Sequence, residues 1–70
     1  MKAIKMTVTG VGEAIMLGNF VECINLDDDV AATLLSKDTA FIAVEGDCAL
    51  SYVEVLASRR FYEYEIENIK

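Results

Sequence analysis

The sequence predicts an α+β fold, a small and mostly antiparallel sheet of four or five strands with one helix packed on one face. Three observations lead to this prediction. Apolar and polar residues alternate near both ends of the chain, as they do in half-buried strands. Residues 28–37 are the most helix-like run, with helical spacing and acids at the start. Proline is absent and only 4 glycines occur, so residues 1–70 are expected to form a single small domain.

The first predicted strand covers residues 2–10, KAIKMTVTG. Ile4, Met6 and Val8 alternate with polar residues, so one side of the strand would face a core and the other solvent. A second extended run is expected over residues 15–25, IMLGNFVECIN. These two strands would form a hairpin.

Gly10 and Gly12 separate the two predicted strands, and glycine readily adopts the positive φ angles of a hairpin turn. A glycine-rich loop can also offer its backbone amides to a phosphate. The dinucleotide fingerprint needs a third glycine where Ile15 stands, and the P-loop needs a Gly-Lys-Ser/Thr sequence that this chain lacks. The hairpin turn is therefore the favoured interpretation.

Three consecutive acids, Asp27, Asp28 and Asp29, stand at the start of the predicted helix over residues 28–37. Asp27 can accept hydrogen bonds from first-turn amides, and the other two carboxylates lie at the positive end of the helix dipole. A calcium loop would need acids at alternate positions, a glycine and a distal glutamate. The triplet therefore predicts a helix start and no metal site.

The next two segments follow the helix. Residues 39–47, TAFIAVEGD, are rich in strand-forming residues and end in a turn dipeptide, so a strand is expected. Residues 48–58 fit either a helix or a strand. The strand is favoured because Val53 and Val55 prefer extended backbone.

The clearest predicted strand covers residues 60–69, RFYEYEIENI, with alternating aromatic or apolar and acidic positions. One face would carry Tyr62, Tyr64 and Ile66. The other would carry a row of three acids, Glu63, Glu65 and Glu67. The apolar faces of all these elements give the expected core: Ile4, Met6, Val8, Ile15, Leu17, Val21, Val30, Leu34, Phe41, Ile42, Tyr62, Tyr64 and Ile66.

Apolar residues make up 54% of this 70-residue chain. A chain of this size buries only about 60% of the surface that its unfolded form exposes. The surplus of apolar residues predicts a homo-oligomer, in which a second copy covers part of that surface. Cys23 and Cys48 are expected to be free, buried thiols, because two cysteines do not make a disulfide scaffold.

The net charge of −6 and the isoelectric point near 4.3 disfavour direct binding to nucleic acid. Arg59 and Arg60 form the only basic pair, which we interpret as part of a turn with cross-strand salt bridges. No uncharged run approaches the roughly 18 residues of a membrane helix, and no signal peptide is evident. A cytoplasmic protein without membrane contact is expected.

Enzymatic activity is not expected from this composition. The chain has no histidine, which removes the commonest general base and also a zinc site built from histidine and cysteine. Neither cysteine has an evident activating partner. The sequence therefore predicts a non-enzymatic protein without a cofactor or a metal.

These observations predict an acidic protein–protein interaction protein. In its sharpest form it would be a small inhibitor or accessory factor that occupies a basic, nucleic-acid-binding surface of a protein partner. The expected contact residues are Glu63, Glu65, Glu67, Asp27, Asp28 and Asp29. The alternative is a small-ligand-binding protein whose pocket forms between subunits of a homo-oligomer.

Overall fold

The computed structural model describes residues 2–69, which form an α+β fold. The elements follow one another as β1 (Lys2–Val8), α1 (Val11–Ile24), β2 (Val30–Leu34), β3 (Thr39–Val44), α2 (Asp47–Arg60) and β4 (Tyr64–Ile69). The α+β class and the antiparallel sheet are confirmed. The expectation of a single helix was wrong, since the described residues form two helices and one four-stranded sheet.

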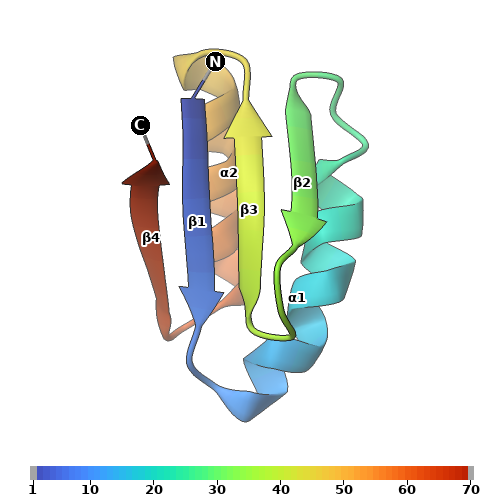
Figure 1. The fold of residues 1–70 in the computed structure, drawn as a ribbon, viewed down its shortest axis with the longest axis vertical. Helices are drawn as coiled ribbons and strands as arrows, with labels where there is room; N and C mark the ends of the chain where they lie inside the picture. The colour runs from blue at the N-terminus through green and yellow to red at the C-terminus, as the bar shows by residue number, and fades with distance from the viewer. Residues whose placement is uncertain (1, 70) are drawn as a thin grey trace.

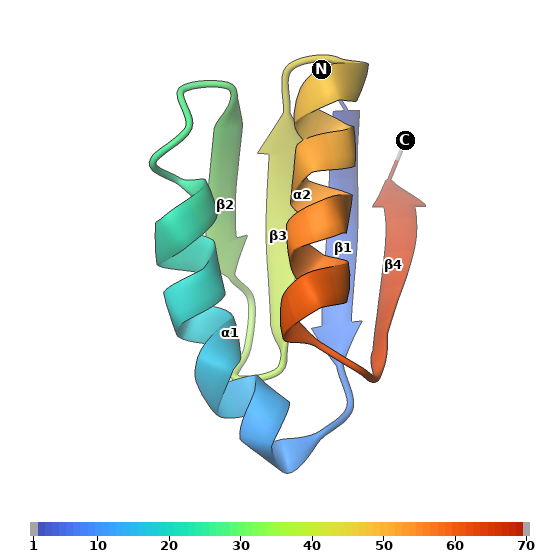
Figure 2. The same ribbon diagram turned by 180° about the vertical axis from the view of Figure 1, so that it is seen from behind.

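The four strands lie in the order β2-β3-β1-β4, and each neighbouring pair is antiparallel (Figure 1). Both helices cover the same face of the sheet (Figure 2). This is the split β-α-β arrangement also called ferredoxin-like topology. The topology leaves the second sheet face uncovered but does not by itself specify a function.

Strand β1 lies at the centre of the sheet, as its alternating sequence suggests. Ile4, Met6 and Val8 are buried beneath the helices. The register places Ile4 opposite Ile42 of β3, so the two central strands contribute neighbouring apolar side chains to the core. The first predicted strand is therefore confirmed.

Helix α1 replaces the predicted second strand. Leu17, Phe20, Val21 and Ile24 are buried, and their spacing places them on one helical face. Because the chain turns helical at this point, Ile15 lies on the opposite side and is 78% exposed rather than buried. The expected hairpin over residues 2–25 was therefore wrong.

The two glycines that suggested a hairpin turn instead begin this helix. Gly10 is the N-cap residue, with extended backbone, and Gly12 lies in the first turn. The structure therefore places a strand, a glycine-containing loop and a helix start in succession.

Strand β2 replaces the predicted helix over residues 28–37. The Asp27 carboxylate accepts a hydrogen bond from the Asp29 amide at 2.9 Å, which closes a turn instead of capping a helix. Val30 then enters an edge strand with its side chain buried, while Leu34 at the other end is 44% exposed. Pairing with β3 thus prevails over the local helical spacing.

Helix α2 includes the ambiguous residues 48–58, so the favoured strand interpretation was wrong and the helical alternative holds. Its buried residues Ala49, Val53 and Ala57 recur every fourth position, on one face. Gly46 precedes the helix with a φ of 89°, a left-handed conformation that glycine adopts without a Cβ clash.

The core lies between the sheet and the two helices. Of the predicted core, seven residues are buried and two, Tyr64 and Ile66, are half-buried against it. Tyr62 is 96% exposed because the chain bends before β4, and the half-buried Phe41 faces the uncovered side of the sheet. The prediction missed the contributions of the helices and β3: Phe20, Ile24, Ala40, Val44, Ala49, Val53, Ala57 and Phe61.

Candidate functional site

The uncovered face of the sheet has a small, apolar centre and an acidic border. Ala3 of β1 lies between Ala43 and Ile69 of the neighbouring strands. Lys5 lies in the next row between Phe41 and Glu67. Neither described helix covers this side of the sheet (Figure 1), and all of these side chains except the buried Ala43 are at least partly exposed.

The predicted row of glutamates follows the outer strand, with one difference from the sequence interpretation. Glu65 and Glu67 lie on the uncovered face of β4, whereas Glu63 stands just before that strand begins. All three are exposed. The Glu67 carboxylate lies 3.7 Å from the Lys5 ammonium, while Glu65 is opposite Thr7 and has no ion pair within residues 2–69.

The predicted Asp27–Asp29 group lies in the connection that leads into β2, at the opposite side of the sheet from β4. Besides the side-chain bond that closes the turn, the Asp27 carbonyl accepts from the Val30 amide at 3.1 Å. The Asp29 carbonyl accepts from the Glu45 amide at 2.9 Å. The six predicted contact residues therefore form two separate groups rather than one acidic face.

The outer edge of β2 is partly closed by a side chain that sequence analysis missed. The Asn25 carboxamide donates to the Ala32 carbonyl at 2.8 Å and accepts from the Ala32 amide at 2.7 Å. In this way it reproduces the paired hydrogen bonds of a neighbouring strand. The Val30 amide also donates, to the Asp27 carbonyl, so the outward amides of both Val30 and Ala32 on the β2 edge have hydrogen-bond partners.

The outer edge of β4 differs. The Thr9 amide donates to the Glu63 carbonyl at 3.1 Å, which fixes the alternation of the β1–β4 ladder. Glu65, Glu67 and Ile69 therefore direct their backbone groups toward β1, and Tyr64, Ile66 and Asn68 direct theirs outward. Within residues 2–69, no other segment hydrogen-bonds to these outward groups.

Glu13 of α1 anchors the segment that leads into β4. Its carboxylate accepts from the Tyr62 amide at 3.0 Å and from the Glu63 amide at 3.3 Å. Sequence analysis missed this contact, because Glu13 was expected near a hairpin turn and not in the first turn of a helix. These two bonds hold the residues just before β4 against the first turn of α1.

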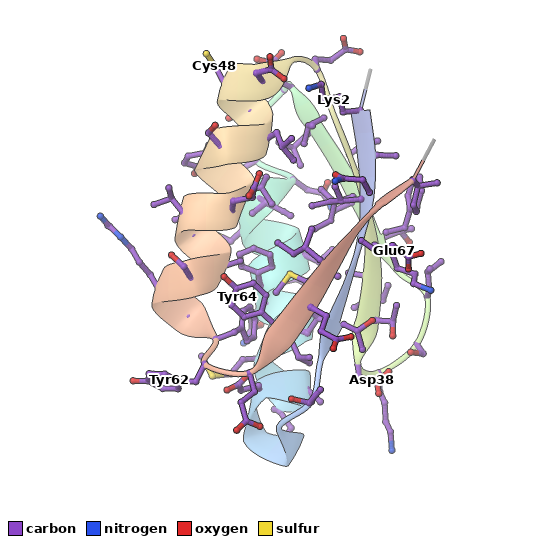
Figure 3. All side chains as sticks on the ribbon, turned by 90° about the vertical axis from the view of Figure 1, so that its left-hand side faces the viewer. Lys2, Asp38, Cys48, Tyr62, Tyr64 and Glu67 are labelled. Atoms are coloured by element: carbon purple, nitrogen blue, oxygen red, sulfur yellow. The ribbon has the colours of Figure 1, made fainter. Side chains whose placement is uncertain are left out.

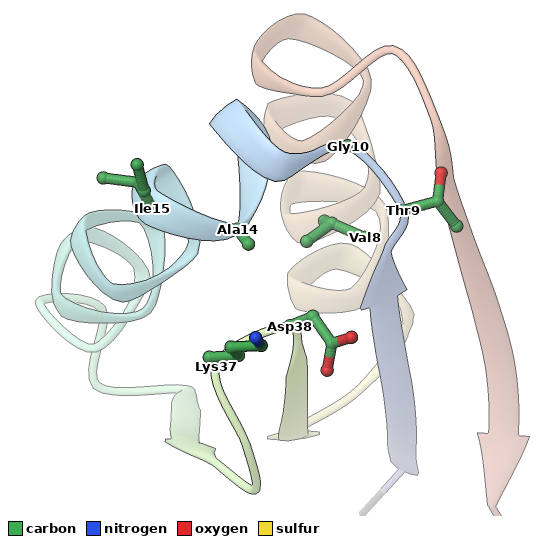
Figure 4. Close-up of a pocket in the computed structure, with 7 residues that line it drawn as sticks. All are labelled: Val8, Thr9, Gly10, Ala14, Ile15, Lys37 and Asp38. Atoms are coloured by element: carbon green, nitrogen blue, oxygen red, sulfur yellow. The ribbon is translucent and has the colours of Figure 1, made fainter.

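A pocket of about 310 Å³ lies at this same end of the molecule, beside the start of α1 (Figure 4). It is formed within one chain, where β1 passes into α1 beside the β2–β3 turn. Its lining is mostly apolar and consists of Val8, Thr9, Gly10, Ala14, Ile15, Lys37 and Asp38. The pocket is therefore a candidate binding site for a small ligand, and no second subunit is needed to form it.

Asp38 at the pocket border is held in its charged form. The Ser36 hydroxyl donates to its carboxylate at 2.7 Å and the Thr39 hydroxyl at 3.1 Å. These hydrogen bonds, with a smaller contribution from the Lys37 charge, lower the pKa of Asp38 below its ordinary value. The pocket therefore carries one cation and one anion at its border.

The basic pair and the cysteines differ from expectation. Arg59 and Arg60 lie in the last turn of α2, where they complement the helix dipole, and neither forms a salt bridge within residues 2–69. Arg60 Nη2 instead lies 3.8 Å from Cys23 Sγ. Both cysteines are free as expected, but Cys23 is only half-buried and Cys48 is exposed.

Among residues 2–69 no group of three or more potential ligands is arranged to hold a metal ion. None of the described helices has the length and apolar character needed to cross a membrane. Comparisons with protein-family models, curated proteins and solved structures found no match to this chain. The geometry of the described residues is therefore the basis for assigning a function.

Proposed function

We propose that this chain is a non-enzymatic protein–protein interaction protein that binds a basic surface of a protein partner through the acidic border of its sheet. The observation that supports this proposal is the exposed row formed by Glu63, Glu65 and Glu67 beside an uncovered sheet face. Within residues 2–69, Lys5 is the cation near this row, and it lies beside Glu67. We call these three residues the glutamate row.

The spacing of the glutamate row suits a repetitive basic surface. Residues two apart in a strand project to the same side at intervals of about 6 to 7 Å. Concentrated negative charge, added to a net charge of −6, attracts cationic side chains and repels phosphate. A partner surface that holds nucleic acid has the matching charge, so this chain would act there as an inhibitor or accessory factor.

The proposal is tested by affinity capture from the native host, followed by mass spectrometry. The test variant replaces Glu63, Glu65 and Glu67 with glutamine, which preserves size and removes charge. The matched control replaces three exposed glutamates elsewhere: Glu22, Glu45 and Glu54. A basic partner retained by the wild type and the control but lost by the test variant supports the proposal.

Equal capture by the test variant and the control contradicts the proposal, because the net charges of these two proteins are the same. Circular dichroism of both variants checks that they keep the fold.

The two free thiols fit our further proposal of a cytoplasmic location, which microscopy of the tagged protein tests.

A second candidate function is the binding of a small molecule in the 310 Å³ pocket. Its mostly apolar lining and single cation, Lys37, favour a ligand with an apolar body. Thermal-shift screening against metabolites and nucleotides tests it, with Ala14→Trp as the variant that fills the pocket. A ligand that stabilises both proteins equally contradicts this site.

Self-association is the third part of the proposal, and the exposed apolar side chains support it. Ile15 and Leu26 lie on the α1 side of the molecule, with 78% and 84% of their surfaces exposed. A second copy that covers them would stabilise the oligomer through apolar burial. Sedimentation at micromolar concentration is expected to give a species heavier than 7.7 kDa, and a pure monomer contradicts self-association.

A further inference from the structure

We infer that the partner contributes an extended segment that adds to the sheet as a fifth strand beside β4, with lysine or arginine at alternate positions. This inference rests on the proposed function and specifies the chemistry of the partner. Strand addition uses the backbone groups of an open sheet edge for affinity and the alternate side chains for specificity.

The backbone of β4 provides the first requirement. Tyr64, Ile66 and Asn68 direct their amide and carbonyl groups away from β1, and β4 is the last strand in the sheet order. Figure 3 views the molecule from this side, where β4 lies in front of the rest of the sheet. An added strand would form its hydrogen bonds with these three residues.

The opposite edge of the sheet does not provide an equivalent site. At β2, Asn25 already bonds both the amide and the carbonyl of Ala32, and the Asp27 carbonyl bonds the Val30 amide. A competing strand would have to displace these bonds. The backbone therefore favours β4 over β2 as the acceptor of a partner strand.

The side chains of β4 determine which strand fits. On the uncovered face, Glu65 and Glu67 would lie next to the side chains of the added strand, and opposite charges at such cross-strand positions are stabilising. On the helix face, Tyr64 and Ile66 are half-buried and would be covered further. The fitting segment alternates basic and apolar residues.

A second copy of this chain does not meet that requirement. When two β4 strands pair antiparallel about Ile66, Glu65 of each copy lies opposite Glu67 of the other. A shift by one pairing step toward either end places Glu65 opposite Glu65 or Glu67 opposite Glu67. Like charges directly opposite one another are destabilising, so charge selects a basic partner over self-pairing at this edge. Self-association would therefore use another surface.

The test uses two synthetic seven-residue peptides with free backbone amides. In the first, valine and lysine alternate; in the second, the same residues are grouped into one valine block and one lysine block. Fluorescence anisotropy measures the affinity of each peptide for the intact protein. We expect the alternating peptide to bind roughly tenfold more tightly, because only its lysines all face the glutamate row while its valines cover Tyr64 and Ile66.

Two pairs of variants separate charge from strand addition. The Glu65→Gln/Glu67→Gln protein should bind the alternating peptide about tenfold more weakly, with Glu22→Gln/Glu54→Gln as the matched control. Asn68→Pro removes one outward amide without removing a bond to β1, and it should weaken binding about threefold to tenfold, whereas Asn68→Ala should not. Bound peptide should also slow hydrogen exchange at the Tyr64, Ile66 and Asn68 amides.

The two proposals fail in different ways. If both peptides bind equally and both lose affinity with the Glu65 and Glu67 substitutions, the acidic surface stands and strand addition is overturned. If neither peptide binds while the host partner is still captured in a manner that depends on the glutamate row, strand addition is also overturned. Affinity unaffected by these substitutions contradicts the proposed function itself. Exchange at the β4 amides that slows with protein concentration alone assigns the edge to a second copy and overturns the inference.

Discussion

The two outer strands of the sheet have the same backbone chemistry and different surroundings. At β2, the connection from α1 supplies Asn25, whose carboxamide takes the place of a neighbouring strand at Ala32. At β4, the outward groups have no such cap within residues 2–69, and glutamates line the strand instead. Natural sheets protect edges with charge or with covering segments, and this protein uses one device on each side.

The largest expected effect comes from Phe61→Ala, which would destabilise the β4 side of the molecule. The Phe61 ring is buried, with its centroid 5.3 Å from Phe20 and 6.5 Å from Tyr64. Its removal should lower the free energy of unfolding by about 3–5 kcal/mol. Urea denaturation measures this loss, and Tyr62→Ala is the control because that neighbouring side chain is 96% exposed. Equal losses for the two variants would show that Phe61 is not a core residue.

Asn25→Ala tests the β2 edge. Two hydrogen bonds to Ala32 are lost, which should reduce the free energy of unfolding by roughly 1–3 kcal/mol. The uncapped edge should also increase concentration-dependent association, measured by sedimentation. Asn19→Ala, on the exposed side of α1, should change neither quantity. Unchanged stability and association in Asn25→Ala would mean that the carboxamide does not close this edge.

Glu13→Ala tests how the start of β4 is held. The carboxylate accepts from the Tyr62 and Glu63 amides, so its loss should cost about 1–2 kcal/mol of unfolding free energy. Glu13→Gln keeps an acceptor oxygen and should lose less. Thermal unfolding of both variants, with Glu22→Ala as the control, measures the difference. If Glu13→Ala and Glu22→Ala unfold alike, the contact does not anchor β4.

The smallest expected effect is a loss of stability in acid. Hydrogen bonds from Ser36 and Thr39 lower the pKa of Asp38 below the ordinary 3.8, and the Lys2 ammonium lowers that of Asp47. A depressed carboxyl pKa stabilises the fold at any pH above 3.8, and that stabilisation is lost as the pH falls through the folded-state value. The free energy of unfolding, measured by urea denaturation between pH 6 and pH 2, should therefore fall less steeply with decreasing pH in Asp38→Asn/Asp47→Asn than in the wild type. If the variant loses as much stability in acid as the wild type, these two groups are not the cause.

The predictable parts of the fold were those in which one face of a strand is buried. Strand β1 and the glutamate face of β4 follow from strict alternation. The helical spacing of Leu17, Phe20, Val21 and Ile24 was present in the sequence, but the two glycines before that run favoured a hairpin turn and therefore a second strand. In residues 48–58, the strand preference of Val53 and Val55 was likewise given more weight than the helical spacing.

The candidate site was only partly predictable for a different reason. The period of two identifies the glutamate row from the sequence. The roles of Asn25 and Glu13 depend instead on contacts between different elements: Asn25 follows α1 and bonds β2, and Glu13 in α1 bonds the segment before β4. The Asp27–Asp29 group was assigned to a helix start, whereas the same carboxylate can close a turn before a strand. Local chemistry permits both uses, and only strand pairing decides between them.

Hydrogen exchange at single amides tests the contrast between the two edges most directly. Ala32 on β2 and Ile66 on β4 both direct their amides outward. Among the described residues, 2–69, the Ala32 amide has a hydrogen-bond partner and the Ile66 amide has none. After correction for intrinsic rates, NMR on the free protein should show Ala32 exchanging roughly tenfold or more slowly than Ile66. Equal protection of the two amides, or slower exchange at Ile66, would contradict the account of one closed and one open edge.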